Sequence, residues 1–167
     1  MKLGARGWSA LFALYTVVGA LGFWYRYLDD LARGHGGTLP SRLIEESTGV
    51  YTAFVLVPLI LALCRRLPWS SAAWPRVIAL QVLGGVVYSL LHTTLMALTR
   101  AAIFPLAGFG PYNYGNMSWR YPMELANDIV DYTIIVAAFY VVERIRLARE
   151  SELRSAHLQA ELAETKL

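Results

Sequence analysis

Cysteine and charged residues are both scarce in this chain. Cys64 is the only cysteine among 167 residues, so no disulfide can form within the chain, and thiol-exchange enzymes with paired cysteines are excluded. Charged residues make up 16% of the sequence, hydrophobic residues make up 56%, and the mean hydropathy is +0.43. This balance lies outside the range of an ordinary soluble domain. The composition therefore predicts an integral membrane protein, with the lipid bilayer as a partner.

Four apolar stretches have the length of a membrane-spanning helix, which needs about 20 largely apolar residues to cross a core of roughly 30 Å. They are residues 8–27, 49–64, 77–98 and 125–142. The second is short, and we expect its helix to begin near Ser41, before the membrane. The predicted fold class is an all-α membrane protein. Residues 1–142 form a four-transmembrane-helix bundle, and residues 143–167 extend the fourth span as a C-terminal cytoplasmic helix.

The positions of the basic residues predict the topology. They cluster near both ends and between the second and third spans, at Lys2, Arg6, Arg65, Arg66, Arg76, Arg144, Arg146 and Arg149. If the spans alternate in direction, all of these lie on one side, and the positive-inside rule makes that side the cytoplasm. We therefore expect a multi-pass protein of the bacterial inner membrane with both termini in the cytoplasm. No basic stripe with interleaved aromatic residues occurs, so no nucleic-acid partner is expected.

Polar residues follow one face of the third span and one stripe of the fourth. On the third span, small or polar residues recur at helical spacing, at Gln81, Gly85, Tyr88, His92 and Thr99. Ionisable groups inside a span cost at least about 2.5 kcal/mol each near the membrane centre, so they normally face the bundle interior and find partners. The fourth span carries carboxylates at i, i+4 and i+7 with an amide beside them. The ligand or sensing candidates are therefore His92, Tyr88, Glu124, Asn127, Asp128 and Asp131.

Depth in the membrane pairs His92 with two of these carboxylates. At a rise of 1.5 Å per residue, His92 lies roughly 12 Å below Arg100, and Asp128 and Asp131 lie about 9 to 14 Å below Pro122. We therefore predict a hydrogen bond from His92 to Asp128 or Asp131. Three interpretations are open: a buried structural pair, a small-ligand or proton-responsive site, or a site for Mn, Fe or Zn on these three residues. A b-type haem held by two histidines within the spans is excluded, and the sequence assigns no cofactor.

The loop at residues 104–122 combines glycine and proline with aromatic side chains. The aromatic residues are Phe104, Phe109, Tyr112, Tyr114, Trp119 and Tyr121. Such a loop could close over a ligand, but aromatic side chains also suit the lipid headgroup region, and we favour this second interpretation.

Residues 143–167 contain neither proline nor glycine and are rich in Ala, Leu, Arg and Glu, which predicts a helix continuous with the fourth span. Two apolar stripes coexist in this segment. One comprises Ala148, Ser151, Ser155, Leu158 and Leu162, and the other comprises Leu153, Ala156, Ala160, Ala163 and Leu167. Exposed leucines stabilise a lone helix poorly, so we expect a coiled coil and a homodimer, in a register that the sequence leaves open.

The same segment, ERIRLARESELRSAHLQAELAETKL, resembles the linker of LytS/YehU-type (LytTR-regulator-associated) bacterial sensor histidine kinases, which joins a multi-span membrane domain to the phosphoacceptor helix. The resemblance implies a homodimeric receptor whose kinase core would follow Leu167 and would partner a response regulator. Neither a phosphoacceptor histidine box nor an ATP-binding motif occurs in these residues, so no catalytic residue is assigned. This segment is expected to bind and transmit, and the whole protein to be a histidine kinase.

A transporter or channel is the alternative function class. In an oligomer, the carboxylate stripe of the fourth span could conduct protons or cations. Four spans without an internal repeat, followed by a long C-terminal helix, favour signal transfer.

Overall fold

The structure is a computed structural model that describes residues 4–68 and 74–164, and the fold of this part of the chain is all-α, as predicted. Its four helices are α1 (Ala5–Ala32), α2 (Leu39–Arg66), α3 (Trp74–Leu106) and α4 (Met117–Glu164). Each is long and apolar enough to cross a membrane, because even 28 residues reach about 42 Å at 1.5 Å per residue. The chain is therefore a multi-pass membrane protein with a four-helix bundle. Lys2 and Leu167, named above for topology and for the linker stripe, lie outside the described residues.

The helix boundaries follow local chemistry. Helix α2 begins two residues before the expected Ser41, with Pro40 in its first turn, where a missing backbone N–H removes no helical hydrogen bond. Gly34 and Gly37 lie between α1 and α2 with φ angles of 77° and 81°, a conformation that favours glycine. These two glycines let the chain reverse within the six residues 33–38.

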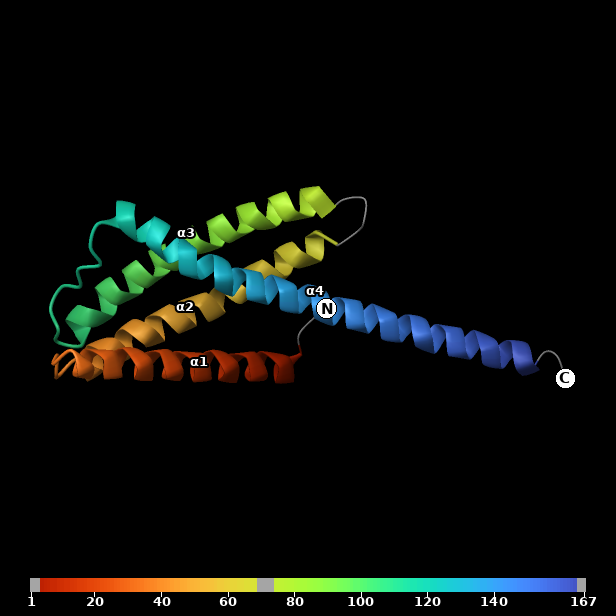
Figure 1. Ribbon diagram of the computed structural model, residues 1–167, viewed down its shortest axis with the longest axis horizontal. Helices are drawn as coiled ribbons and strands as arrows, with labels where there is room; N and C mark the ends of the chain where they lie inside the picture. The colour runs from red at the N-terminus through yellow and green to blue at the C-terminus, as the bar shows by residue number, and fades with distance from the viewer. Residues whose placement is uncertain (1–3, 69–73, 165–167) are drawn as a thin grey trace.

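Figure 1 shows the arrangement of the helices. The connections 33–38 and 107–116 lie together at one end of the bundle, which we call the loop end. The start of α1 and the end of α2 lie toward the opposite end, which we call the linker end. Helix α4 crosses the bundle obliquely and continues well beyond it, as predicted for a helix without proline or glycine after residue 142.

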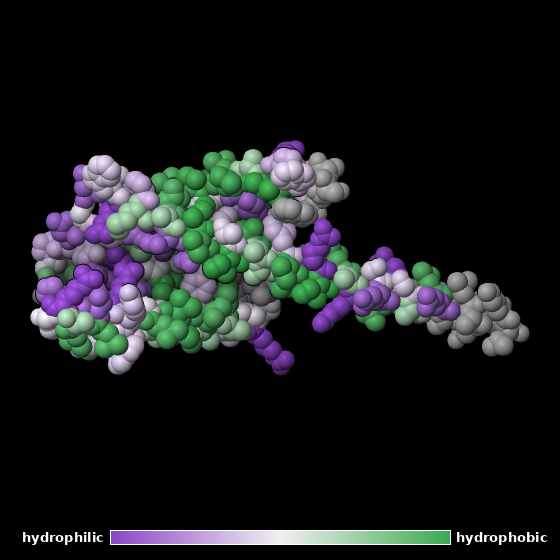
Figure 2. Space-filling view, in the orientation of Figure 1, coloured by the Kyte–Doolittle hydropathy of each residue, from purple (hydrophilic) through white to green (hydrophobic). Residues whose placement is uncertain are grey.

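Packing between the helices is uneven. Helix α2 contacts all three others and α3 contacts α4, but among the described residues α1 packs on α2 alone. The apolar core lies among α2, α3 and α4 and comprises Leu56, Val57, Ile60, Leu61, Cys64, Tyr88, Tyr132 and Phe139. Cys64, at 1% exposure, is a packing residue. On the surface, hydrophilic side chains gather at the loop end, whereas apolar side chains cover much of the bundle behind it (Figure 2).

Close contact between α3 and α4 depends on Gly84 and Gly85. A Cβ atom at Gly84 would lie 2.5 Å from the hydroxyl of Tyr132, and one at Gly85 would lie 2.8 Å from Cδ1 of Ile129. Small residues at such crossings let membrane helices approach closely, and van der Waals packing then stabilises the pair. The polar face predicted for α3 therefore lies against α4.

Candidate functional site

His92 and Asp128 form a buried pair between α3 and α4. The Nδ1 atom of His92 lies 2.7 Å from Oδ1 of Asp128, and the two residues are 6% and 2% exposed. Ser89 donates a hydrogen bond to the other carboxylate oxygen at 2.7 Å, and Nε2 of His92 lies 2.9 Å from the backbone oxygen of Gly49. The predicted hydrogen bond is thus confirmed with Asp128 as the partner. Through Gly49 the pair also holds α2, so three helices meet at one polar point.

The geometry restricts the protons on this pair. Both ring nitrogens of His92 face oxygen atoms, and a neutral imidazole carries only one N–H. Either the ring is protonated and donates to both oxygens, or Asp128 carries the extra proton and donates it to Nδ1. Both arrangements are electrically neutral as a pair, which is the condition under which ionisable groups are tolerated in a membrane interior.

Tyr88 supports this pair from one side. Its ring stacks on the ring of His92 with the centroids 5.7 Å apart and an angle of 12° between the planes. The hydroxyl group of Tyr88 is buried and has no hydrogen-bond partner in the described part of the chain. Tyr88 therefore positions the imidazole ring by packing, and it does not line the cavity described next.

A cavity of about 870 Å³ lies beside the pair, bounded by α1, α2 and α4, with residues of α3 and the loop 107–116 at its loop end. His92, Glu124, Asn127, Asp128 and Asp131 all line it, so the carboxylate stripe predicted on the fourth span faces one space. Asp131 does not bond to His92, and no hydrogen bond or ion pair joins it to another described residue. Its side chain is exposed to the cavity.

The loop end of the cavity is closed by aromatic and charged groups that the sequence did not single out as a site. Arg100 donates from Nε to the hydroxyl of Thr48 at 2.9 Å and from Nη2 to the backbone oxygen of Glu45 at 2.8 Å. The rings of Tyr112 and Tyr114 lie 5.8 Å and 5.2 Å from its guanidinium carbon. Tyr112 and Tyr114 of the aromatic segment thus line the loop end of the cavity, whereas Phe109 and Trp119 are exposed on the surface.

The two tyrosines of this loop are held as hydrogen-bond donors. Burial is the main cause that raises the pKa of Tyr114, and its hydrogen bond to Glu124 raises it further. Burial likewise raises the pKa of Tyr112. Both phenols therefore stay protonated well above neutral pH, and Tyr114 donates to Oε1 of Glu124 at 2.9 Å. Glu124 is thereby tied to the loop and not to His92.

The metal interpretation gains no geometric support. Within residues 4–68 and 74–164, no three side chains of His, Cys, Asp or Glu are arranged to hold a metal ion. His92 and Asp128 supply two donors, but Asp131 is not brought to the same point.

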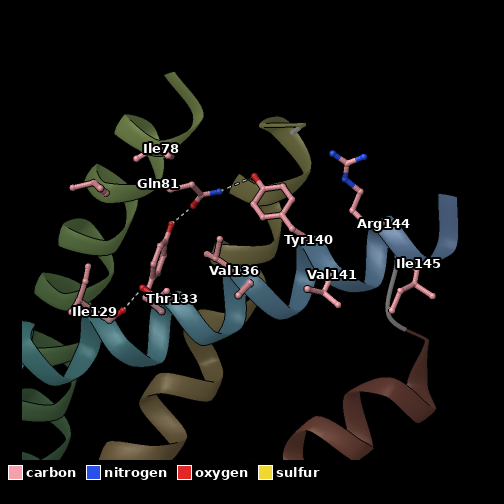
Figure 3. Close-up of a pocket in the computed structure, with 12 residues that line it drawn as sticks. Ile78, Gln81, Ile129, Thr133, Val136, Tyr140, Val141, Arg144 and Ile145 are labelled. Carbon is pink, nitrogen blue, oxygen red and sulfur yellow. Dashed lines mark hydrogen bonds between the residues drawn. The ribbon is translucent and has the colours of Figure 1, made fainter. Parts of the chain in front are cut away.

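A second polar network lies nearer the linker end, beside a groove between α3 and α4 (Figure 3). Tyr132 donates to Oε1 of Gln81, Nε2 of Gln81 donates to the hydroxyl of Tyr140 at 3.1 Å, and Tyr140 donates to the backbone oxygen of Leu67 at 2.7 Å. Gln81 belongs to the predicted polar face, but its tyrosine partners were missed. Their spacing along the apolar fourth span is typical of residues packed in a hydrophobic core.

The chain was compared with known proteins. No protein-family model, curated protein or solved structure matches it.

Proposed function

We propose that this chain is the transmembrane input domain of a two-component sensor histidine kinase of the LytS/YehU type, in the bacterial inner membrane with both termini in the cytoplasm. It detects a ligand or a condition at the loop end or within the membrane. It passes the signal through a dimeric helical linker to a kinase core that follows Leu167 and acts on a response regulator.

One observation carries this proposal: a single uninterrupted helix connects the buried pair with the projecting linker. Helix α4 holds Asp128 near its start and runs to Glu164, a length of about 72 Å for its 48 residues at 1.5 Å per residue. The bonds of Asp128 to Ser89 and of Tyr132 and Tyr140 to Gln81 fix the rotation of α4 against α3. A change at the cavity that moves Asp128 therefore moves the linker as well.

The exposure of residues in the fourth span supports one of the two linker stripes as the pairing face. Extended toward the membrane, the stripe of Leu153 and Ala156 meets Tyr132 and Phe139, which are 3% and 6% exposed within their own bundle. The other stripe continues in heptad spacing through exposed residues of the span, and we call this continuous set the seam. It comprises Val130, Ile134, Ala137, Val141, Arg144, Ala148, Ser151, Ser155 and Leu158. Heptad spacing keeps one face toward a partner helix, so we propose that two chains pair along the seam.

Cysteine cross-linking tests this pairing. In a Cys64→Ala background, single cysteines at Ala148, Ser151, Ser155 and Leu158 should form disulfide-linked dimers several-fold more efficiently than cysteines at Arg149, Leu153 and Ala156. The reason is that only the first set faces the seam partner. Equal yields at all positions, or higher yields in the second set, would contradict pairing along the seam.

Reporter fusions test the topology. A reporter placed after Leu167 and one inserted among Gly34, Gly36 and Gly37 should lie on opposite sides of the membrane, the first in the cytoplasm, because the basic residues 65 and 66 and those after residue 142 resist translocation. Paired alkaline phosphatase and green fluorescent protein fusions at both sites give the measurement. The same reporter active at both sites would exclude the proposed arrangement of four spans.

A transporter has less support. Asp128 is occupied by His92 and Ser89, and Glu124 is occupied by Tyr114. Toward the linker end the cavity is lined by apolar residues such as Leu61, Phe139 and Val142. A continuous polar path across the membrane is what ion conduction requires.

A further inference from the structure

The cavity beside the buried pair changes character along its length. At the loop end its walls carry arginines, carboxylates and tyrosines. At the linker end they are apolar, with Leu14 and Val18 on α1, Ala53 and Val57 on α2, and Ala138 and Phe139 on α4. The apolar part extends between α1 and α4, which do not pack on each other in the described residues. A ligand that fills this space needs a polar head and an apolar chain.

Most charges at the polar end already have partners. Glu46 is paired with Arg26 at 2.9 Å, and Glu45 with Arg42 at 2.8 Å. Arg42 in addition binds both carboxylate oxygens of Asp30, at 2.7 and 2.9 Å. These pairs leave no strong attraction for a further charged group at their positions.

Arg100 is the exception. Its hydrogen bonds go to uncharged acceptors, namely the hydroxyl groups of Thr48 and Tyr112, the backbone oxygen of Glu45 and the sulfur of Met96. No described carboxylate forms an ion pair with it. Arg100 is half-buried and lines the cavity. The nearest hydrogen-bonded carboxylate, that of Glu45, reaches it only through the hydroxyl group of Tyr112, so the guanidinium group has no directly bonded counterion in an environment where water screens charge poorly. A guanidinium group forms strong bonds with carboxylate and phosphate groups.

We propose that the cavity binds an amphiphile with an anionic head group at Arg100 and a single alkyl chain between α1 and α4. The volume of about 870 Å³ lies within the roughly 300–1,000 Å³ of pockets that enclose small molecules. A fatty carboxylate and a lysophosphatidate both have this chemistry. They differ below the head group, because lysophosphatidate carries a glycerol hydroxyl between phosphate and chain, whereas the chain of a fatty carboxylate begins at once. Asp131 lines the cavity on the chain side of Arg100 and can accept a hydrogen bond from that hydroxyl. This inference rests on the proposed function, because it names the class of ligand that the same site would bind.

Binding is measured by native mass spectrometry of the whole chain, released from a non-ionic detergent. The probes are hexadecanoate, 1-hexadecanoyl lysophosphatidate, hexadecyltrimethylammonium as the cationic match, and acetate and glycerol 3-phosphate as matches without a chain. At least one anionic amphiphile should bind ten-fold or more tightly than the cationic and chainless probes. Equal binding of the anionic and cationic amphiphiles would overturn the proposal.

Two pairs of variants locate the binding. Ala138→Trp fills the apolar part of the cavity and should lower affinity about ten-fold, whereas Ala20→Trp, at an exposed alanine of α1 outside the cavity, should change nothing. Arg100→Gln should also lower affinity about ten-fold, whereas Arg33→Gln, at a residue that pairs with Asp29 away from the cavity, should not. Thermal unfolding shows which variants fold. Where Arg100→Gln does not fold, the wild-type head-group comparison and Ala138→Trp decide, and affinity unchanged by Ala138→Trp overturns the proposal.

Asp131→Leu identifies the source of the head group. Lysophosphatidate should bind several-fold more weakly to this variant, and hexadecanoate equally or more tightly. Failure of this inference is distinct from failure of the proposed function. Amphiphile binding without any change in kinase output, in a protein with a histidine-kinase core after Leu167, would leave the binding site standing and refute the sensor role. Kinase output that depends on His92 and Asp128 without amphiphile binding would support the sensor role and refute the amphiphile site.

Discussion

His92→Leu and Asp128→Leu should each destabilise the protein by about 3 to 5 kcal/mol, because each leaves the other group charged or unpaired in a buried place. The double variant should recover most of this loss, since an apolar replacement of a buried pair is often nearly neutral. Recovery stays incomplete because Ser89 loses its carboxylate partner. Its hydroxyl can instead bond to a backbone oxygen of its own helix. Thermal unfolding in detergent measures each variant.

Asp131→Leu is the matched control, because Asp131 lies on the same helix and lines the same cavity but makes no bond to His92. Its effect should stay within about 1 kcal/mol, and its coupling to His92→Leu should be much smaller than that of Asp128→Leu, because no direct bond joins Asp131 to His92. Additive losses for His92 and Asp128 would mean that the two side chains do not interact. If the double variant regains stability and kinase output, the pair is structural; if it regains stability and stays unresponsive, the pair is part of the sensing site.

Insertions into the linker should uncouple the input domain from a kinase core according to their length. Two alanines inserted after Arg149 rotate the following helix by about 200°, and seven rotate it by only about 20° short of two full turns. Alanine is the best helix former, so neither insertion should interrupt the helix. We expect the two-residue insertion to reduce the response more than ten-fold, because Ser151 and Leu158 then leave the seam. The seven-residue insertion should keep the response within about three-fold.

Kinase output in a protein with a histidine-kinase core after Leu167 is the measurement, and cross-linking at Ala148 controls for pairing above the insertion. Equal loss of response for both lengths would show that coupling depends on the length of the linker and not on its rotation. Equal retention would show that rotation of α4 carries no signal. Either result would remove the physical link between the cavity and the linker.

The helices and the buried pair were predictable because both follow from rules local to one helix. Apolar length determines a span, and the equal depth of His92 and Asp128 follows from a rise of 1.5 Å per residue. Ser89 stands three residues before His92, on the same helical face, so its contribution could have been anticipated. The spacing could not choose between Asp128 and Asp131, because that choice depends on the rotation of α4 against α3.

The loop end was not predictable from the sequence. Arg100 meets Tyr112 and Tyr114 because the loop 107–116 folds back over the end of α3, and glycines with positive φ at Gly108, Gly110 and Gly115 permit many such paths. Composition alone made these aromatic side chains resemble headgroup anchors. The linker register that we propose was not predictable for a different reason. Which stripe is free depends on which face the bundle has already used.

The single line of contact that holds α1 has a mechanical consequence. A helix that packs along one side only resists sliding along its neighbour more than it resists rotation away from the bundle. Its contacts with α2, such as Gly19 beside Val50 and the cluster of Trp8, Phe12 and Tyr15 around Phe54, all lie along that side. No backbone packing of α1 on α3 or α4 in the described residues opposes a movement of α1 away from the bundle. Helix packing therefore fixes the position of α1 against α2 alone and leaves the width of the gap between α1 and α4 free to follow what occupies it.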